Sequence, residues 1–286
     1  MHTISGTTTL ICLLGHPIAH SVSPRMHNAA FDALGLDYAY LAFDVTPDDL
    51  PFALRGLRTF GARGCNLTMP LKKAVIPHLD ELSDAARLSG SVNTIVIENG
   101  KLIGHTTDGI GYVDALKKED GFDIPGKTIT LLGAGGAAES IITQAALSGA
   151  KEIRVFKRKN ATFANAAAFA GKIADATGCA VSVLPMEDAD ALRSSIAGSD
   201  LLCNATNVGM GDDARTLVPK EFLHKGLFVS DIIYHPAETT LLSDAKNAGC
   251  RTANGANMLL YQGAAAFWLW TGHEMPVEAA KQALNG

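Results

Sequence analysis

The sequence has little of what marks membrane, secreted or nucleic-acid-binding proteins. No stretch approaches the ~18 uncharged apolar residues of a membrane-spanning helix, and residues 1–10 lack the basic start of a signal peptide. Positive charge is scarce, because 24 Lys and Arg face 29 Asp and Glu, which leaves a formal net charge of -5. These absences predict a cytoplasmic protein that binds neither membranes nor nucleic acid.

Metal-binding and disulfide patterns are missing as well. The five cysteines have no CxxC pair or zinc-type spacing, and the nine histidines form no HExxH set. We therefore expect no metal site and reduced thiols that pack as small hydrophobic groups. These cysteines are Cys12, Cys65, Cys179, Cys203 and Cys250.

What is present is an alternation of short apolar runs with helical patterns over 286 residues, of which 47% are hydrophobic. Such alternation is typical of α/β proteins with parallel sheets, and the length suits one large or two ordinary domains. In the first third, the pattern predicts strands at 9–14 and 38–45 and a helix at 24–34. A second helix is predicted with Thr46 as its cap and Pro47 in its first position.

A hairpin and a connection are expected further along the chain. Residues 92–97 and 102–105 flank Asn99-Gly100, the dipeptide that best suits a tight type I′ turn. This predicts an antiparallel edge of the sheet. The polar segment 118–127 is interrupted by Gly and Pro, which predicts a surface connection before a second domain.

A glycine-rich loop opens the second half. A strand-like run at 128–132 leads into GAGGAA, then into a helical pattern that stops near Gly149, then into a second strand-like run at 153–156. A strand, a glycine loop and a helix in this order place backbone N–H groups against a pyrophosphate. The pattern therefore predicts dinucleotide binding by Gly133, Ala134, Gly135, Gly136 and Ala137.

The choice of dinucleotide is expected to depend on the residues that follow the second strand. An acidic residue there would accept hydrogen bonds from the free ribose hydroxyls of NAD, but this chain has Lys157, Arg158, Lys159 and Asn160. Three cations suit a 2′-phosphate, whereas Asn160 suits a free ribose hydroxyl. The sequence favours NADP and leaves NAD open.

Several short motifs recur along nearly the whole chain. They are GHPIxHSxSP (15–24), NxTxPxK (66–72), VNT (92–94), TDG (107–109), the glycine loop, NATxxGM (204–210), DxxYxP (231–236), GxxMLxxQGA (255–264) and WTG (270–272). In this order they resemble the shikimate dehydrogenase family. The stretches FDIPGKTITLLGAGGAA, FKRK and LLYQGAAAFWLWTG are most similar to its quinate/shikimate dehydrogenase branch.

The resemblance implies reversible oxidation of a ring hydroxyl, of shikimate to 3-dehydroshikimate or of quinate to 3-dehydroquinate, with hydride transfer to a nicotinamide. The motif assigns the proton relay to Lys72 and Asp108, whereas Lys73 falls one position outside it. Removal of hydride from an alcohol carbon requires the hydroxyl proton to leave, and a positioned lysine can take it. We expect Asp108 to orient Lys72.

The resemblance also implies the binding residues. Ser21 and Ser23 match the family's carboxylate-binding serines, although from the residues alone Ser23 is better interpreted as a helix cap. The ring hydroxyls are expected to contact Thr68, Asn93, Asp108 and Gln262.

On the cofactor side, Tyr234 is expected beside the nicotinamide or the substrate. Thr206 and Gly255 match family motifs there, and Met210 and Met258 are placed near the nicotinamide, with a plain core role equally open for the two methionines.

The resemblance implies an N-terminal α/β substrate domain, residues 1–112, completed by C-terminal helices at 255–286, and a Rossmann-like domain with a parallel sheet at 120–254. The active site is expected in the cleft between them, in a monomer or homodimer. Thr106, Asn207 and Asn257 depart from the family's pattern, which leaves shikimate against quinate open.

Three alternatives remain. One is a dehydrogenase of a related cyclic polyol or amino-polyol acid. Another is an oxidoreductase for an unrelated hydroxy substrate, which would leave the paired serines unexplained. The third is a non-catalytic sensor of quinate or nucleotide, against which Lys72 and Asp108 argue.

Overall fold

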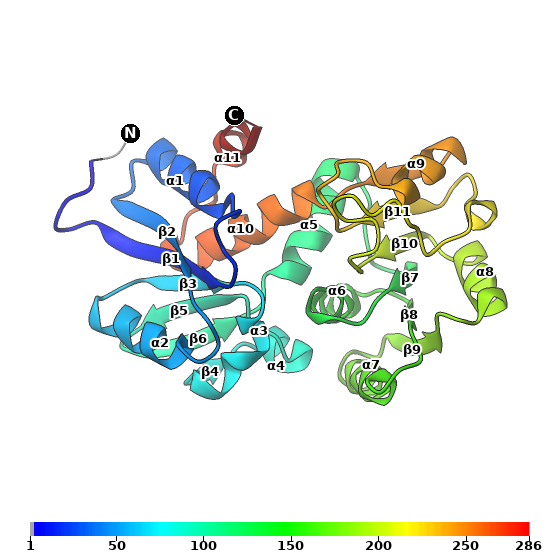
Figure 1. The fold of residues 1–286 in the computed structure, drawn as a ribbon, viewed down its shortest axis with the longest axis horizontal. Coiled ribbons are helices and arrows are strands. Elements are labelled where there is room, and N and C mark those ends of the chain that lie inside the picture. Colours follow the sequence, from blue (N-terminus) through cyan, green and yellow to red (C-terminus); the bar gives the residue numbers. More distant parts are fainter. Residues whose placement is uncertain (1–2, 286) are drawn as a thin grey trace. The chain divides into compact units, whose positions relative to one another are not determined.

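The computed structural model describes residues 3–285 and divides the chain into two compact units, each shown as a ribbon in Figure 1. Unit 1 contains the residues up to Gly111 and those from Leu260 on, and unit 2 runs from Tyr112 to Leu259. The two boundaries fall inside helices α5 (Asp108–Asp120) and α10 (Ala256–Thr271).

Unit 1 is built on a mixed six-stranded sheet in the order β2-β1-β3-β5-β6-β4. Pairs β1–β2, β1–β3 and β4–β6 are parallel, and pairs β3–β5 and β5–β6 are antiparallel. The strands are β1 (Thr9–Gly15), β2 (Tyr38–Asp44), β3 (Gly64–Leu67), β4 (Glu81–Leu82), β5 (Thr94–Glu98) and β6 (Lys101–His105). The helices are α1 (Ser23–Leu34), α2 (Leu50–Thr59), α3 (Leu71–Ala74), the 3-10 turn η1 (Ile76–His78), α4 (Asp84–Ser89), α11 (Val277–Asn285) and most of α10.

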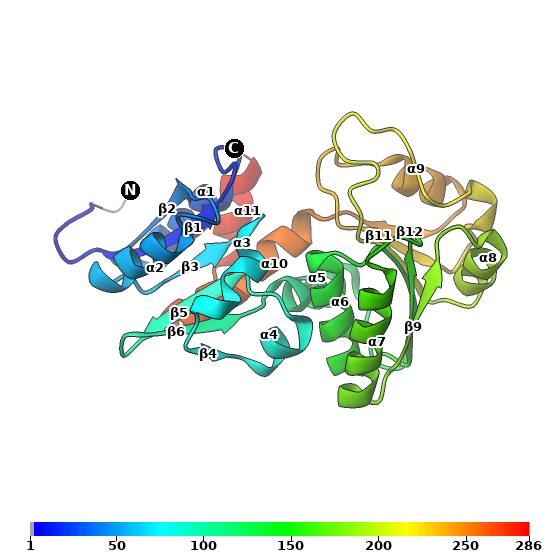
Figure 2. The same cartoon turned by 60° about the horizontal axis from the view of Figure 1, so that its bottom comes forward.

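Helices cover both faces of this sheet. On one face, α2, α3 and α4 bury side chains such as Leu54, Leu71 and Ala86 against strand residues (Figure 2). On the other face, α1 and α10 contribute an aromatic cluster in which Phe31 stacks on Phe267 with ring centroids 5.1 Å apart. Burial on two faces explains why the central strands are apolar in nearly every position rather than alternating.

Unit 2 is a parallel six-stranded sheet in the order β12-β11-β10-β7-β8-β9. Helices α6 and α7 lie on one face, and α8 and α9 lie on the other (Figures 1 and 2). The strands are β7 (Thr128–Leu132), β8 (Glu152–Lys157), β9 (Ala180–Pro185), β10 (Leu201–Asn204), β11 (Phe228–Asp231) and β12 (Arg251–Ala253). The helices are α6 (Gly136–Leu147), α7 (Phe163–Thr177), α8 (Ala189–Ala197), α9 (Thr240–Asn247) and the 3-10 turn η2 (Lys220–Phe222). The predicted fold class, an α/β protein with a Rossmann-like parallel sheet, is confirmed.

Two predictions about the helices of unit 1 are wrong. The second helix begins at Leu50, after a turn in which the Thr46 hydroxyl donates to the Asp49 carboxylate at 2.7 Å, and Pro51 takes the first-turn place predicted for Pro47. Ser23 does not cap α1, because Val22 holds the cap position without a side-chain bond. The predicted proline, Pro24, does lie in the first turn of α1, whereas Pro47 lies before α2, in the turn that the Thr46–Asp49 hydrogen bond closes.

The hairpin and the connection also differ from expectation. Asn99 and Gly100 do form the turn, with φ angles of 50° and 76°, but the short parallel strand β4 flanks β6, so the hairpin is not the edge of the sheet. Segment 118–127 is not simply a surface connection. Helix α5 continues to Asp120, and Phe122 and Ile124 are buried at 8% and 1% exposure. The segment is held against the protein because its two apolar side chains are buried, although the residues around them are polar.

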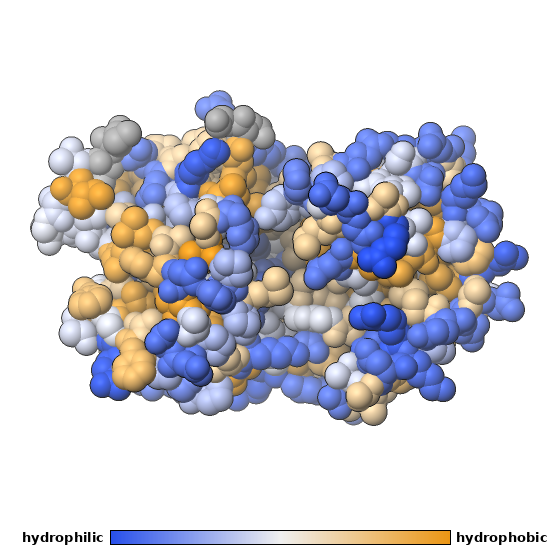
Figure 3. Space-filling view, in the orientation of Figure 1, coloured by the Kyte–Doolittle hydropathy of each residue, from blue (hydrophilic) through white to orange (hydrophobic). Residues whose placement is uncertain are grey.

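The surface shown in Figure 3 is largely polar, and the cysteines are unpaired. Figure 3 shows hydrophilic residues over most of one face, with hydrophobic residues in smaller groups. Within residues 3–285, no helix has the length and apolar character to cross a membrane. All five cysteines are free thiols, and all but the half-buried Cys250 are buried, as predicted.

Candidate active site

A lysine–aspartate pair lies at the ends of two segments of unit 1. The Lys72 Nζ and the Asp108 Oδ2 are 2.6 Å apart, with side-chain exposures of 23% and 9%. Lys72 lies on α3, directly after β3, and its carbonyl accepts a hydrogen bond from the Val92 N–H at 2.9 Å. Asp108 is the first residue of α5, where the helix dipole favours a negative charge. The two charges are thus held together within a largely enclosed site.

Asn93 fixes the other side of the carboxylate. Its Nδ2 donates to the Asp108 Oδ1 at 2.8 Å, and its Oδ1 accepts the Thr107 backbone N–H at 2.7 Å. A flipped amide would place an oxygen against the carboxylate and an N–H against another N–H. The two carboxylate oxygens therefore have separate partners, Asn93 on one and Lys72 on the other.

Gln262 reaches the same group from α10. Its Oε1 accepts from the Asn93 Nδ2 at 3.4 Å. This approach depends on Gly111, because a Cβ there would lie 2.3 Å from the Gln262 backbone nitrogen. The glycine lets α5 and α10 approach closely at the point where α10 presents the glutamine.

The remaining predicted substrate residues of unit 1 lie at the ends of neighbouring strands. Ser21 and Ser23 follow β1 and begin α1, and the Ser21 hydroxyl accepts from the Ser23 N–H at 3.3 Å. Thr68 follows β3, and its N–H donates to the Leu14 carbonyl of β1 at 2.9 Å. Hydroxyl groups that follow adjacent parallel strands lie at one edge of the sheet, as an oxygen-rich ligand requires.

The glycine loop of unit 2 forms as predicted between β7 and α6. Gly133 has a φ of 105° and the space of its missing side chain is occupied, since a Cβ would lie 2.8 Å from the Ala205 carbonyl oxygen. Gly135 caps α6 in an extended conformation, and a Cβ there would meet no atom within 4 Å. The first N–H groups of α6, at Gly136 and Ala137, therefore face an open position suited to an anion.

The basic segment follows β8 at the next strand of the sheet. The Lys157 Nζ donates to the Asn160 Oδ1 at 2.9 Å, and the same oxygen accepts from the Thr162 N–H and hydroxyl. Arg158 and Lys159 are exposed. The Asn160 oxygen is thus committed to its own turn, whereas the guanidinium of Arg158 has no hydrogen-bond partner among the described residues.

A third loop of unit 2 is held by a buried carboxylate. Asp231 is 1% exposed, and burial raises the pKa of this carboxyl while hydrogen bonds from Ile233, Thr239 and Asn204 oppose the rise. The Asn204 Oδ1 in turn accepts from the Thr206 hydroxyl at 2.7 Å. Sequence reasoning noted these motif residues without a role, and the structure shows that Asp231 and Asn204 position Thr206.

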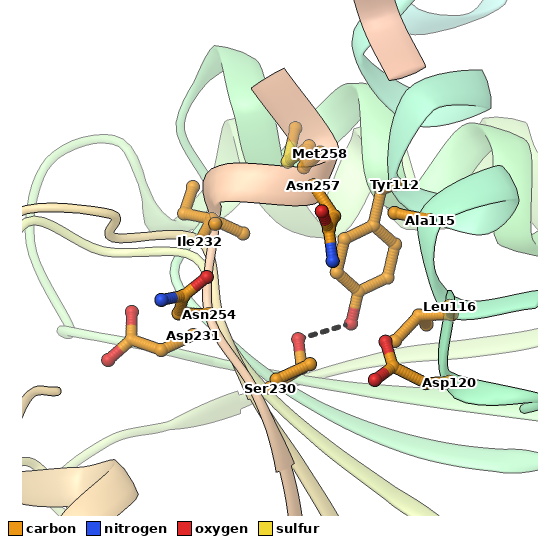
Figure 4. Close-up of a pocket in the computed structure, with 12 residues that line it drawn as sticks. Tyr112, Ala115, Leu116, Asp120, Ser230, Asp231, Ile232, Asn254, Asn257 and Met258 are labelled. Atoms are coloured by element: carbon orange, nitrogen blue, oxygen red, sulfur yellow. Dashed lines mark hydrogen bonds between the residues drawn. The ribbon is translucent and has the colours of Figure 1, made fainter. Parts of the chain in front are cut away.

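Figure 4 shows a pocket of unit 2 in which two predicted cofactor residues, Gly255 and Met258, take part. Asn257, one of the departures from the family's pattern, lies beside the ring of Tyr112, whose hydroxyl is 2.8 Å from the Ser230 hydroxyl. Two further residues that were predicted near the nicotinamide, Met210 and Tyr234, lie at the surface and are 52% and 48% exposed. Their contacts with a cofactor or substrate stay predictions.

Sequence reasoning missed several polar residues that hold the Lys72–Asp108 pair. Thr107 bonds both ends of the Asn93 amide, and three more side chains extend this network away from the pair, namely those of Tyr40, Asn66 and Thr94. For Asn66, Thr94 and Thr107 a signal was present, because these three lie within the motifs, but strand residues such as Thr94 also occur for β-propensity alone. Tyr40 lies outside the motifs. Over residues 3–285, no group of three or more His, Cys, Asp or Glu side chains could hold a metal ion.

Comparison with known proteins agrees with this arrangement. Residues 13–95 match the family model described as the shikimate dehydrogenase substrate binding domain, and residues 255–284 match the shikimate 5'-dehydrogenase C-terminal domain. A shikimate dehydrogenase (NADP(+)) of Streptococcus uberis is 50% identical over 286 residues, which are 98% of this chain and 97% of that protein. A quinate/shikimate dehydrogenase of Escherichia coli O139:H28 is 45% identical over 278 residues, which are 96% of each chain.

A solved structure is similar throughout. It is the shikimate 5-dehydrogenase of Listeria monocytogenes in complex with shikimate and NAD, which has a TM-score of 0.96, 49% sequence identity and 99% coverage of both chains. The resemblance inferred from the motifs is thereby confirmed over nearly the full length. The chain belongs to the shikimate dehydrogenase family.

Proposed function

We propose that the protein catalyses the reversible oxidation of the ring hydroxyl of shikimate to 3-dehydroshikimate with NADP. The observation that carries the proposal is the Lys72–Asp108 pair at 2.6 Å, with Asn93 on the second carboxylate oxygen. A polar pair of this kind, enclosed on most sides and fixed by hydrogen bonds, is what a proton relay needs. The curated relatives named shikimate dehydrogenase support the substrate and the cofactor.

The residues of unit 2 fit a dinucleotide. The space beside Gly135 and the N-terminal N–H groups of α6 suit a pyrophosphate, because no side chain fills the position that a Cβ would take. We infer that Gly133 to Ala137 hold the pyrophosphate, and that Thr206, Met210, Gly255 and Met258 lie toward the nicotinamide. When bound, the nicotinamide accepts or returns the hydride.

The preference for NADP follows from the basic segment. Arg158 offers an exposed planar donor group for a 2′-phosphate, and Lys157 and Lys159 add positive charge beside it. Asn160 uses its oxygen within its own turn, so only its N–H group is left for a free ribose hydroxyl. The Listeria monocytogenes relative was solved in complex with NAD, so NAD stays the second candidate cofactor.

The proposed chemistry of the chain's own groups takes place at Lys72. In the oxidation direction, Lys72 in its neutral amine form takes the proton of the ring hydroxyl and becomes an ammonium, and in the reduction direction this ammonium returns a proton to the carbonyl oxygen. Asp108 holds the Nζ in position and keeps its own charge paired. Asn93 donates to the Asp108 Oδ1, so the Oδ2 is the carboxylate oxygen that faces the Lys72 Nζ.

The substrate is held by groups that match an acid with several hydroxyls. Ser21 and Ser23 bind the carboxylate, and neutral donors and acceptors bind the hydroxyls, namely Thr68, Asn93, Gln262 and Tyr234, together with Asp108. Quinate is the second candidate, because the Escherichia coli relative is named quinate/shikimate dehydrogenase. Quinate adds a tertiary hydroxyl, so one further hydrogen bond decides between the two acids.

The test is an initial-rate assay with shikimate and quinate, each with NADP and with NAD, followed by the absorbance of the reduced nicotinamide. We expect the highest kcat/KM for shikimate with NADP. Turnover of quinate at a comparable rate would establish dual specificity. Absence of turnover in all four combinations, from protein with a cooperative unfolding transition, would overturn the proposal.

A further inference from the structure

The hydrogen bonds around Asp108 continue into the sheet of unit 1 beyond the residues that the proposed reaction uses. The Tyr40 hydroxyl donates to the Asn66 Oδ1 at 2.7 Å, and the Asn66 Nδ2 donates to the Thr94 hydroxyl at 3.0 Å. The Thr94 hydroxyl then donates to the Asn93 Oδ1 at 3.2 Å. These bonds connect the middle of β2 with the carboxylate through β3 and β5.

We propose that Tyr40, Asn66 and Thr94 form a positioning network that fixes the Asn93 amide and, through it, the Asp108 carboxylate that orients Lys72. This inference rests on the proposed function. None of the three residues is assigned to the substrate, the cofactor or the reacting atoms. They act through Asn93 and set the geometry in which the lysine meets the hydroxyl.

The donors at Tyr40 and Asn66 are determined, and the Thr94 hydrogen has two acceptors within reach. The Tyr40 hydroxyl must donate, because the Asn66 Oδ1 has no hydrogen, and this leaves the Asn66 Nδ2 for the Asn93 carbonyl and for Thr94. The Thr94 hydroxyl accepts from that Nδ2, so its own hydrogen points to the Asn93 Oδ1 or to the Thr107 hydroxyl. The chain of donors therefore ends with the Asn93 Nδ2 on Asp108.

Because these side chains are buried, loss of any one hydrogen bond in the network costs free energy. Tyr40 and Thr94 are 0% exposed, and Asn66 is 5% exposed. A buried polar group that loses its partner has no water to replace it, so removal of one bond leaves another group unsatisfied. A disturbance at Thr94 is therefore expected to reach Asn93 rather than to be absorbed locally.

The far end of the network is electrically neutral. The His27 ring stacks on Tyr40 with centroids 4.4 Å apart, and neither His27 nitrogen has a hydrogen-bond partner among residues 3–285. Burial lowers the pKa of His27 to about 3 and raises the pKa of Tyr40 well above its usual value. Tyr40 thus remains a protonated donor, and no charge competes with Asn66 for its hydrogen.

The test compares Thr94→Val with Thr94→Ser and with Thr130→Val. The first variant removes the hydroxyl and keeps the shape, and the second keeps the hydroxyl. The third is a matched control, because Thr130 is a fully buried strand threonine of unit 2 whose hydroxyl also has a hydroxyl partner, Ser199, at 2.8 Å. We measure kcat and KM for shikimate, the Kd of shikimate by calorimetry, and the unfolding transition of each variant.

We expect Thr94→Val to lower kcat by about tenfold or more, since small misplacements of reacting groups cost up to ~100-fold, while the Kd of shikimate stays within about twofold. Thr94→Ser should restore most of kcat, and Thr130→Val should leave it unchanged. Tyr40→Phe, which keeps the ring on His27, should lower kcat by a smaller factor in the same direction.

Two results would overturn the inference. One is a Thr94→Val enzyme with undiminished kcat in a background where the wild type turns over shikimate. The other is an equal loss in Thr94→Val and Thr130→Val, which would mean a general loss of structure. A wild type without turnover would instead contradict the proposed function, and the inference with it, so the two failures are distinct.

Discussion

The two sites of this protein are built in different ways. The glycine loop of unit 2 is one continuous piece of chain, in which β7, the loop and α6 follow one another and backbone N–H groups make the site. The polar site of unit 1 uses side chains from separate segments, including Lys72 on α3, Asp108 on α5 and Gln262 on α10. A site made of consecutive backbone can be identified from a short motif, whereas a site made of side chains depends on the tertiary fold.

The two sites also differ in how their charges are satisfied. Lys72 is paired with Asp108 at 2.6 Å, and the carboxylate has Asn93 as a second partner, so this site is organised before any ligand arrives. Arg158 in unit 2 is exposed, and its side chain has no hydrogen-bond partner within the described range. Unit 1 therefore holds its charged side chains in a fixed geometry. Unit 2 offers an exposed cation that can pair with an anionic ligand.

The largest effect is expected from the lysine of unit 1. Lys72→Ala should lower kcat by about 100-fold to 10,000-fold, because it removes the group that carries the proton. The Kd of NADP, measured by fluorescence titration, should stay within about twofold, because the proposed nucleotide site lies in unit 2. Lys73→Ala is the matched control, and a similar loss in that variant would contradict the assignment of the proton relay to Lys72.

The glycine loop gives a contrast within unit 2. Gly133→Ala should lower the free energy of unfolding by about 1–3 kcal/mol, because its φ of 105° strains any other residue and its Cβ would meet the Ala205 carbonyl. Gly135→Ala should leave the thermal unfolding midpoint unchanged, since no protein atom lies within 4 Å of the added Cβ. It should raise the KM for NADP, because the added methyl group would contact the pyrophosphate. If Gly135→Ala left the KM unchanged, the loop would not hold the cofactor as proposed.

Cofactor choice should depend on Arg158. Arg158→Ala should raise the KM for NADP by about tenfold or more, because a charge-assisted bond to a 2′-phosphate contributes roughly 1.5–3 kcal/mol. The KM for NAD should change little. Lys151→Ala removes an exposed cation at the other end of β8 and serves as the control. Equal losses for NADP and NAD in Arg158→Ala would argue against a contact with the 2′-phosphate.

At His27 the expected effect concerns stability in acid. The pKa of His27 is about 3 in the folded chain, against an ordinary 6.5, so the unfolded chain binds the extra proton between these values. Stability is thus fully present above about pH 6.5 and falls, at up to roughly 1.4 kcal/mol per pH unit, as the pH drops toward 3. His27→Phe should reduce this loss, as urea unfolding at pH 7 and pH 4.5 will show.

The buried acid of unit 2 provides the opposite sign for comparison. Burial raises the pKa of Asp231, so its contribution to stability is present at low pH and is lost as the pH rises through the folded value. A His27→Phe variant with the same acid sensitivity as the wild type would contradict the role of the neutral histidine in unit 1.

Much of the fold followed from local pattern. The strand at 128–132 was predicted with its bounds, and the Asn99-Gly100 turn formed where the dipeptide indicated. The cap of α1 was misplaced by one residue, and the start of α2 by about one turn of helix, because the hydrogen bond between Thr46 and Asp49 is invisible to a propensity argument. The order of the strands, with β4 beside β6, could not be predicted from the sequence, since pairing between distant segments is decided by the whole sheet.

The sequence by itself determined the α/β class, the glycine loop and, through its motifs, the family and the residues Lys72 and Asp108. These features rest on residues that are neighbours in the chain or that occur in a fixed order. Only the tertiary structure decided that Asn93 lies on one oxygen of Asp108 and that Tyr40, Asn66 and Thr94 support it. The reason is physical: a hydrogen bond depends on distance and direction in space, and these residues meet only when β2, β3 and β5 are assembled in one sheet.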